Sequence, residues 1–356
     1  MPSVPQPESS ETRRPPDVPW SRGYVWMALL AALLLAGMLA ALTIGSYRVS
    51  AADVFRVIAA RLGFGAGDAN VSGIASVVVW NLRFPRIVLA GVVGAALASS
   101  GAVFQAAFRN PLVEPYILGV SSGAAFGAAL GMVLPQFPLS VQGAAFLGAL
   151  AAVGIVRLLA RSRGDAPIVT LVLSGVIVGS MFAAGVSLLK YLANDTALRE
   201  IVFWLLGGFY FATWTDVSVV GPAALAAAAV MTAGGWRLNV LSMGDQEAET
   251  LGINPRRVRG VLLAAATLAT AVSVSAVGIV PWVGLMTPHA VRMLMGPDNR
   301  LVVPGSALVG ALCMLACDTA ARSITTSEIP VGIITALAGG PFLAYLIRQR
   351  TAGLFG

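Results

Sequence analysis

The sequence has few of the residues from which metal sites and disulfide frameworks are built. Histidine occurs once among 356 residues, at His289, so a site with several histidine ligands cannot form within this chain. The two cysteines, Cys313 and Cys317, lie four residues apart in an apolar run. Cysteines in such a run are typically packing side chains, so neither a disulfide framework nor a metal site is expected.

Lysine also occurs only once, at Lys190. It ends the run GVSLLK, so the phosphate-binding motif GxxxxGK[ST] is absent and the chain cannot hold ATP in that way. Any ATP-driven work therefore requires a separate subunit. The sequence also lacks an HExxH motif, a hydrolase nucleophile elbow and paired carboxylates at a catalytic spacing, which argues against a membrane-embedded enzyme.

Charged residues make up only 11% of the chain, whereas apolar residues make up 57% and the mean hydropathy is +0.83. Apolar runs of about 20 residues are long enough to cross a membrane as helices, so the sequence predicts an all-α integral membrane protein. The net charge of +7 falls between these runs. That distribution is typical of membrane topology, so no nucleic-acid partner is expected.

Ten membrane spans are expected, and the one at 284–296 is short for a crossing. Residues 1–23 hold six prolines and are expected to form a disordered tail. Residues 51–62 are predicted to form a surface helix, and residues 199–210 a helix at the mouth of the bundle. Glycines spaced four apart, from Gly119 to Gly131, predict close helix packing. The expected spans are 24–45, 87–107, 115–134, 141–160, 168–189, 214–236, 259–280, 284–296, 301–320 and 331–347.

The basic residues predict how these spans are oriented. With the N-terminus inside, the inner segments carry 15 of the 23 basic residues and the outer segments carry 8. Basic residues concentrate in short loops on the cytoplasmic side, so both chain termini are expected to be cytoplasmic. The polar stretch 237–259 then lies in the cytoplasm as well.

This stretch, RLNVLSMGDQEAETLGINPRRVR, is the main polar interruption of the apolar sequence. Gly244 and Gly252 bracket residues 245–251, which contain neither proline nor glycine, as expected for a short helix. We expect a short amphipathic helix or helix pair at about 239–253 that offers an apolar stripe to another protein. The alternative is a solvated connecting loop. The stripe would comprise Leu238, Leu241, Met243, Ala248, Leu251 and Ile253.

Two further segments place polar groups at or near membrane depth. The loop QAAFRNPLVEPYILG, residues 105–119, predicts irregular backbone that is buried by protein or lines a wet cavity. The alternative is that Arg109 only sets the membrane topology and that the prolines only end helices. In TPHAVR, His289 and Arg292 lie three apart and can share a helix face. A structural histidine is favoured there over a proton relay or a haem ligand.

Charged residues also gather at the expected outer ends of two spans. Asp318 and Arg322 lie four apart, which predicts an ion pair within one helix. Arg83 and Arg86 flank Phe84-Pro85 at the start of the second span. Exposed arginines often do nothing specific, but arginines gathered on one face attract an acidic partner.

Together these motifs resemble the permease subunits of bacterial ABC importers for iron–siderophores, haem and cobalamin, the FecCD type. The resemblance covers about residues 24–350, and several long motifs in the same order make it specific. The motifs are LRFPRIVLAGVVGAALASSGAVFQAAFRNPLVEPYILGVSSGA, MGDQEAETLGI, GLMTPHAVRMLMGPDNR and CDTAARSITTSEIPVGIITALAGGPF.

The resemblance implies one permease domain over 24–350, a short cytoplasmic tail at 351–356 and a bundle like that of cobalamin importer permeases. It implies a homodimer in the bacterial inner (plasma) membrane, two cytoplasmic ATPase subunits and a periplasmic or surface binding protein. The chain itself would bind no cofactor, and ATP and magnesium would lie on the ATPase. Membrane lipid is the remaining expected partner.

The resemblance also implies roles for particular residues. Residues of the polar stretch would couple to the ATPase, three arginines would dock the binding protein, and residues of the loop 105–119 would form the gate. The remaining motif residues would be structural. The coupling residues are Gly244, Asp245, Ala248, Leu251 and Gly252; the docking residues are Arg83, Arg86 and Arg322; the gate residues are Gln105, Asn110, Pro111, Leu112 and Glu114; the structural residues are Pro288, His289, Arg292 and Asp318.

The cargo is not given by these motifs. An iron chelate, either a ferric siderophore or haem, is expected as the commoner cargo of such permeases, and cobalamin is the alternative. A secondary transporter driven by ions would need intramembrane carboxylates along a path. Only Glu114 and Asp318 qualify, and both lie near span ends.

Overall fold

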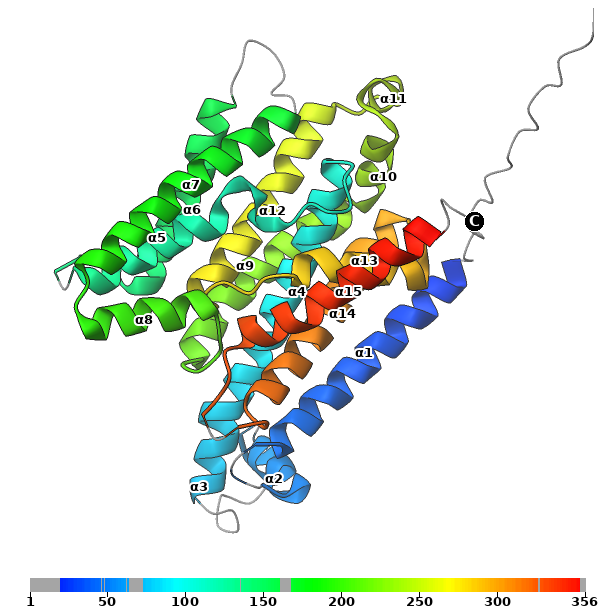
Figure 1. The fold of residues 1–356 in the computed structure, drawn as a ribbon. Helices are drawn as coiled ribbons and strands as arrows, with labels where there is room; N and C mark the ends of the chain where they lie inside the picture. The colour runs from blue at the N-terminus through cyan, green and yellow to red at the C-terminus, as the bar shows by residue number, and fades with distance from the viewer. Residues whose placement is uncertain are drawn as a thin grey trace, which may run out of the picture.

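A computed structural model describes residues 20–45, 47, 49–61, 63, 73–134, 136–160, 168–325 and 327–352. Every regular element in these ranges is helical, and the helices pack into one bundle (Figure 1). Most of the expected N-terminal tail lies outside the described residues, as do residues 353–356. Residues 20–23 already belong to the first helix, and residues 351–352 to the last.

Seven helical stretches in the described ranges are long and apolar enough to cross a membrane. Three further helices, α5 (Val120–Val133), α13 (Val283–Met295) and α15 (Val331–Ala352), occupy the remaining predicted spans. The ten expected positions are therefore all helical. The seven stretches centre on α1 (Trp20–Thr43), α4 (Phe84–Ala107), α6 (Val141–Leu159), α7 (Ile168–Leu192), α9 (Trp214–Ala233), α12 (Pro255–Val277) and α14 (Asn299–Ala321).

Helices α5 and α13 are short because each is preceded by an irregular segment inside the bundle. The predicted span 115–134 began too early: Pro115–Leu118 form a 3₁₀ turn, η3, and Gly119 with φ 74° separates it from α5. The segment after α4 meets the segment between α12 and α13, where the Tyr116 hydroxyl donates to the Val280 carbonyl at 2.7 Å. Irregular backbone is tolerated at membrane depth when protein surrounds it.

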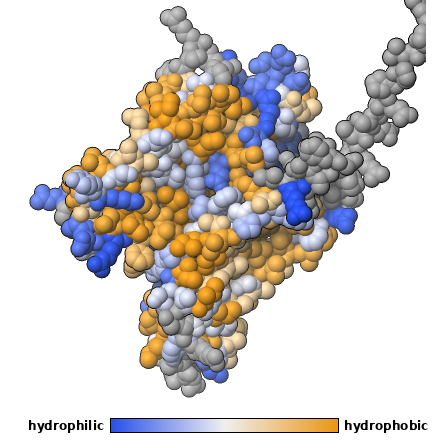
Figure 2. Space-filling view, in the orientation of Figure 1, coloured by the Kyte–Doolittle hydropathy of each residue, from blue (hydrophilic) through white to orange (hydrophobic). Residues whose placement is uncertain are grey.

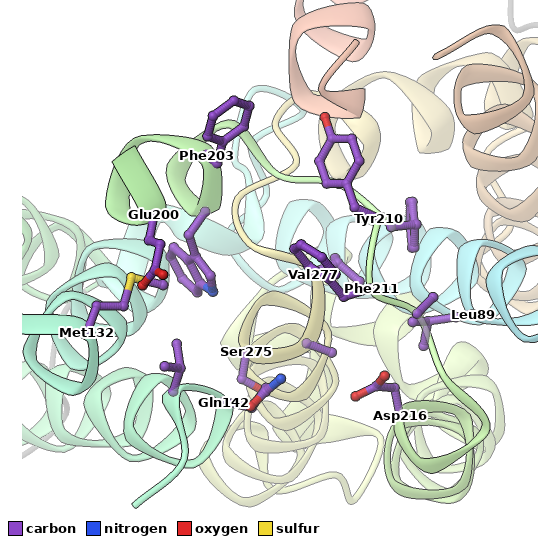
Figure 3. A pocket seen from close by; sticks show the side chains of 16 residues that line it. Leu89, Met132, Gln142, Glu200, Phe203, Tyr210, Phe211, Asp216, Ser275 and Val277 are labelled. Atoms are coloured by element: carbon purple, nitrogen blue, oxygen red, sulfur yellow. The ribbon is translucent and has the colours of Figure 1, made fainter. Parts of the chain in front are cut away.

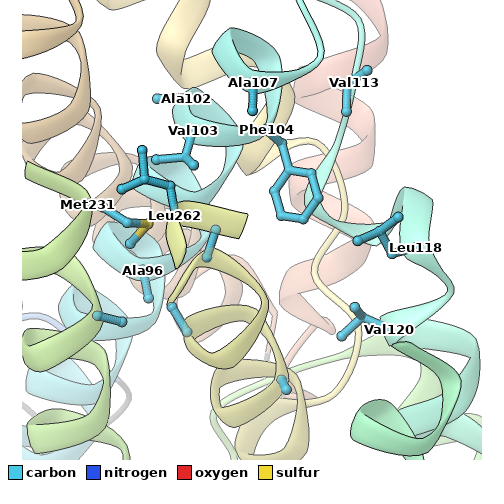
Figure 4. Close-up of a cluster of buried hydrophobic side chains, with 14 of the residues drawn as sticks. Ala96, Ala102, Val103, Phe104, Ala107, Val113, Leu118, Val120, Met231 and Leu262 are labelled. Carbon is cyan, nitrogen blue, oxygen red and sulfur yellow. The ribbon is translucent and has the colours of Figure 1, made fainter. Parts of the chain in front are cut away.

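Helix α4 forms the centre of the bundle and packs against α14, α12, α9 and α13. Its apolar side chains meet those of α9 and α12 in the largest core cluster, in which Phe104, Met231 and Leu262 are buried (Figure 4). Glycine permits the closest approach, because a Cβ on Gly101 would lie 1.8 Å from the Gly284 carbonyl oxygen of α13.

The predicted glycine face of α5 packs in the same manner against α6. A Cβ on Gly127 would lie 2.0 Å from the Ala144 carbonyl oxygen, and one on Gly123 would lie 2.4 Å from the Gly148 carbonyl oxygen. Gly131 has only ordinary contact distances, so the close approach is confined to the middle of the predicted face. Small residues here replace side-chain interdigitation with backbone contact.

The two ends of the bundle carry the remaining helices (Figure 1). At one end lie α2 (Ala51–Arg61), α3 (Gly73–Ser76), the π-helix η2 (Val77–Arg83) and α8 (Asp195–Leu206). Helix α8 begins and ends four residues earlier than the short helix predicted at 199–210. At the other end lie α10 (Gly235–Met243) and α11 (Asp245–Thr250). Figure 2 shows hydrophilic residues over α11 and a broad apolar surface over the long helices, as expected for a membrane protein.

Candidate functional site

The polar stretch folds into the helix pair α10–α11, with Gly244 as the joint. Gly244 has φ 149° and ψ 160°, a backbone conformation that only glycine adopts readily, and Gly252 ends the pair with φ 75°. A solvated loop, the alternative explanation, does not occur here. The sharp joint turns α11 back so that the Glu247 side chain lies against Gly244.

The apolar residues of this stretch do not form the single outward stripe expected from the sequence. Leu238, Leu241 and Ala248 are buried within the chain itself, and Ala248 packs beside Leu241, Ile253 and the start of α12. The two short helices fold onto each other and onto the bundle, so some of their apolar side chains are buried and others remain exposed. Leu251 is 56% exposed, so it is the coupling candidate best placed to contact a partner.

Asp245, the first residue of α11, links three elements by ion pairs. Its carboxylate accepts from Arg259 of α12 at 2.7 and 3.2 Å and from Arg109, at the end of α4, at 2.5 Å. The hydrogen bond from Arg259 and the charges of both arginines hold the pKa of Asp245 below its usual range. Arg109 adopts φ 50°, a strained conformation for a residue other than glycine. The loop 105–119, which we call the gate loop after its predicted role, is thereby tied to the helix pair.

Gln105 organises the inner part of the gate loop. It is buried near the end of α4, where its Nε2 donates to the Leu285 carbonyl of α13 at 3.1 Å. Its Oε1 accepts from Nη1 of Arg292 at 2.6 Å. The predicted gate residue and the predicted structural arginine therefore bind each other and join α4 to α13.

A cavity of about 480 Å³ opens beside this contact. Its lining includes Asn110 and Pro111 of the gate loop and His289 and Arg292 of α13, together with Ser242 of α10. Next to the cavity, the Asn110 side chain accepts from the Leu112 backbone N–H at 2.9 Å, which fixes a tight turn. The structure thus brings the predicted gate and PHxxR motif residues together next to the helix pair.

Glu114 lies at the far end of the gate loop. Its carboxylate accepts from the Trp282 backbone N–H at 3.2 Å, and Trp282 directly precedes α13. Trp282 has φ 75°, so its backbone is strained. Helix α13 has no side-chain cap of its own at Trp282, and Glu114 satisfies one backbone donor there. Together with the Tyr116 contact, this fixes the gate loop to α13.

The three arginines predicted to dock a binding protein are buried and bound within the chain. Arg83 and Arg322 donate to backbone carbonyls at the end of α1, including those of Leu42 and Ile44. Arg86 binds Asp318 at 2.8 Å and Glu328 at 2.7 Å. The predicted pair of Asp318 and Arg322 is present at 3.8 Å, but Arg86 is the nearer partner of Asp318. The docking role of the arginines stays a prediction.

A second cavity, of about 550 Å³, lies at the same end of the bundle as α8 (Figure 3). Five aromatic side chains from α8 and the segment after it line this cavity, and Glu200 and Asp216 lie on opposite sides of it. None of the described residues that line it is lysine, arginine or histidine. The aromatic lining residues are Phe203, Trp204, Phe209, Tyr210 and Phe211.

The apolar bundle with its interrupted helices, internal cavities and helix pair at one end defines a multi-pass membrane transport protein. The chain belongs to the FecCD transport family, which matches residues 33–349, and it is therefore an importer permease of the ABC class. The cobalamin import system permease protein BtuC of Halobacterium salinarum is 45% identical over 293 residues, which are 82% of this chain and 78% of that protein.

Two more similarities extend this result. The hemin transport system permease protein HmuU of Yersinia pestis is 40% identical over 283 residues, 76% of this chain and 84% of that protein. A solved inward-facing conformation of a metal-chelate type ABC transporter is 33% identical, with a TM-score of 0.81 over 91% of this chain and 98% of that one. Other relatives are named for iron chelatin and molybdate transport, so the family does not define the cargo.

Proposed function

We propose that this chain forms a homodimeric pathway that imports a flat metal macrocycle, haem or a corrinoid, across the bacterial inner membrane. An ATPase subunit binds each α10–α11 pair on the cytoplasmic side, and a binding protein delivers the cargo to the α8 end. ATP and magnesium are held by the ATPase, because the chain has no phosphate-binding loop. Both termini are cytoplasmic in this arrangement.

The proposed cargo is inferred from the lining of the cavity at the α8 end. Aromatic side chains stack on flat conjugated rings, and five of them line this cavity. Its charged lining residues, Glu200 and Asp216, are acidic, and the described lining includes no basic residue, so the cavity disfavours a small oxyanion such as molybdate, which also has no ring to stack on the aromatic side chains. Haem agrees with the iron chelate expected from the sequence. Cobalamin is the second candidate, favoured by the relative that is 45% identical.

The contacts at the α11 end supply a route for coupling. A partner that moves α11 pulls on Asp245, and through Asp245 on Arg109 and the gate loop. The gate loop is fixed to α13 by the Glu114–Trp282 and Tyr116–Val280 hydrogen bonds. Movement of the helix pair is thereby converted into movement of α13 relative to α4, which opens the pathway on alternate sides.

The test is uptake by cells that lack the gene, compared with cells in which it is restored. Labelled haem, cobalamin, a ferric siderophore and molybdate are supplied, each with and without vanadate. Restored, vanadate-sensitive uptake of haem or cobalamin is the expected result. Restored uptake of only molybdate or only the siderophore would refute the macrocycle proposal. Uptake that is insensitive to vanadate but abolished by a protonophore would instead support a secondary transporter driven by ions.

A further inference from the structure

The cavity at the α8 end places two carboxylates on opposite sides of the space that a cargo would enter. Glu200 lies in the middle of α8, and Asp216 lies in the first turn of α9 (Figure 3). Neither carboxylate forms an ion pair with a residue that the structure describes. Both charges are therefore directed at whatever occupies the cavity.

The two carboxylates differ in how their oxygens are used. Oδ2 of Asp216 accepts from the backbone N–H and the hydroxyl of Thr213, at 2.9 and 2.7 Å, and so caps α9. Its Oδ1 accepts no hydrogen bond from a described residue, and neither does the exposed side chain of Glu200. Because a carboxylate accepts hydrogen bonds and donates none, these oxygens suit donors on a cargo.

Aromatic side chains accompany both carboxylates. Phe203 and Trp204 lie three and four residues after Glu200, so they share its side of α8. Phe211 lies in the segment that leads to α9 and Asp216 (Figure 3). A flat ring that stacks on these side chains therefore has its rim between the two carboxylates.

The uncharged polar side chains of the lining do not separate one kind of rim from another. The Ser275 hydroxyl already donates to the Val272 carbonyl at 2.9 Å. The Tyr210 ring lines the cavity, but its hydroxyl points away from the other labelled lining residues (Figure 3). The Gln142 amide and the Trp204 indole N–H can each donate to an amide oxygen or to a carboxylate. The choice between rims is left to Glu200 and Asp216.

We infer that Glu200 and Asp216 select a macrocycle whose rim donates hydrogen bonds, as the amides of a corrinoid do, over one whose rim carries carboxylates, as haem does. This inference rests on the proposed function and deepens it. A corrin ring bears amide side chains around its rim, so it can donate to both carboxylates at once. Haem carries its propionates on one edge and apolar groups on the other, so it offers no donor and its propionates are repelled.

Binding to the permease alone tests this inference, because a binding protein makes a selection of its own. The full-length chain in detergent is titrated by equilibrium dialysis with cyanocobalamin and with the derivative in which one rim amide is hydrolysed to a carboxylate. The amide form should bind about tenfold more tightly, which is about 1.4 kcal/mol. Glu200→Gln with Asp216→Asn should remove most of this preference. Each new amide keeps a carbonyl oxygen, so the Thr213 cap of α9 can still form.

Two control variants separate charge from stacking. Asp195→Asn removes an acidic residue from the same helix, α8, that does not line the cavity, and it should leave the preference unchanged. Phe211→Ala shortens an exposed aromatic side chain of the lining, and it should weaken both forms of the cargo by the same factor.

The outcomes distinguish this inference from the proposed function. Equal binding of the two forms, or an unchanged preference in the double variant, would overturn the inference and leave the proposed function standing. Restored cellular uptake of haem without uptake of cobalamin would do the same. Restored uptake of neither macrocycle would refute the proposed function, and the inference with it.

Discussion

Replacing Asp245 with asparagine removes the charge that joins α11 to both α4 and α12. The Arg109 pair is 39% and 44% exposed at its two side chains, so it contributes at the low end of about 0.2–1 kcal/mol. Arg259 is only 15% exposed and would lose its charged partner, which costs about 1 kcal/mol more. We expect Asp245→Asn to lower the free energy of unfolding by about 1–2 kcal/mol.

The larger effect should be on coupling. The Arg109 pair joins α11 to the loop 105–119, and its loss of at most about 1 kcal/mol corresponds to a shift of up to about fivefold between two conformations. The assay is cargo uptake and ATP hydrolysis in proteoliposomes that contain the chain, the ATPase and the binding protein. The cargo transported per ATP hydrolysed should fall by up to about fivefold in the variant, while the ATPase still co-purifies.

A matched variant and a double-mutant cycle make this prediction sharp. Glu249→Gln removes the same charge from an exposed position of α11 and should transport normally. Adding Arg109→Gln to Asp245→Asn should cause little further loss, because Asp245→Asn has already removed the Arg109 contact. Normal coupling in Asp245→Asn, or additive losses in the double variant, would refute the proposed link between α11 and the gate loop.

Three further predictions concern pH, docking and the outer arginines. Because the folded pKa of Asp245 is lowered, its contribution to stability is complete above the unfolded pKa of about 3.9 and is lost as pH falls through the folded value. The loss of stability caused by Asp245→Asn should therefore be the same at pH 6 and at pH 8 in thermal unfolding, and a loss that changes with pH in that range would contradict this. Leu251→Glu should abolish co-purification of the ATPase without changing the melting temperature of the permease, because Leu251 is exposed; normal substrate-stimulated uptake would defeat its assignment. Arg86→Gln should destabilise the chain by about 3–5 kcal/mol, because the buried Asp318 loses its nearest cation, and Arg86→Gln with Asp318→Asn should recover part of this loss in an unfolding assay.

Helix positions were the part of the fold most open to prediction from sequence. Apolar runs of about 20 residues report burial in lipid directly, so all ten predicted spans coincide with helices. The first residues of α5 and α13 were harder to predict from the sequence, because the irregular segments before these helices are as apolar as the helices themselves. The prolines of the loop 105–119 indicated irregular backbone, although Gly119 was assigned to a helix face. The strained backbone of Trp282 has no sequence signal, since tryptophan rarely adopts a positive φ.

The sequence was sufficient to predict which segment forms the candidate site, but not the direction in which its side chains point. The glycines at 244 and 252 located the helix pair, because a positive φ favours glycine. The side toward which each apolar residue points depends on how α10 and α11 fold onto α12, so Ala248 was placed on the wrong face. The burial of Arg83, Arg86 and Arg322 was not predictable either. A charged residue at the end of a span is normally expected to be exposed, but here these arginines bind carbonyls at the end of α1 and the carboxylates of Asp318 and Glu328.

In the proposed mechanism, the ion pairs of Asp245 would let one short helix act on several parts of the bundle. Its carboxylate contacts the end of α4 and the first turns of α12, and these two helices pack against each other in the core. A movement of α11 would therefore be transmitted to α12 and, through Arg109, to the loop 105–119 and the adjoining end of α4. The gate loop, in turn, cannot follow α4 alone, because Glu114 and Tyr116 hold it to the segment before α13. In this proposed mechanism α4 and α13 move relative to each other at the glycine contact of Gly101 and Gly284, where backbones meet without interlocking side chains. The hydrogen bonds that Gln105 makes with Leu285 and Arg292 then have to break.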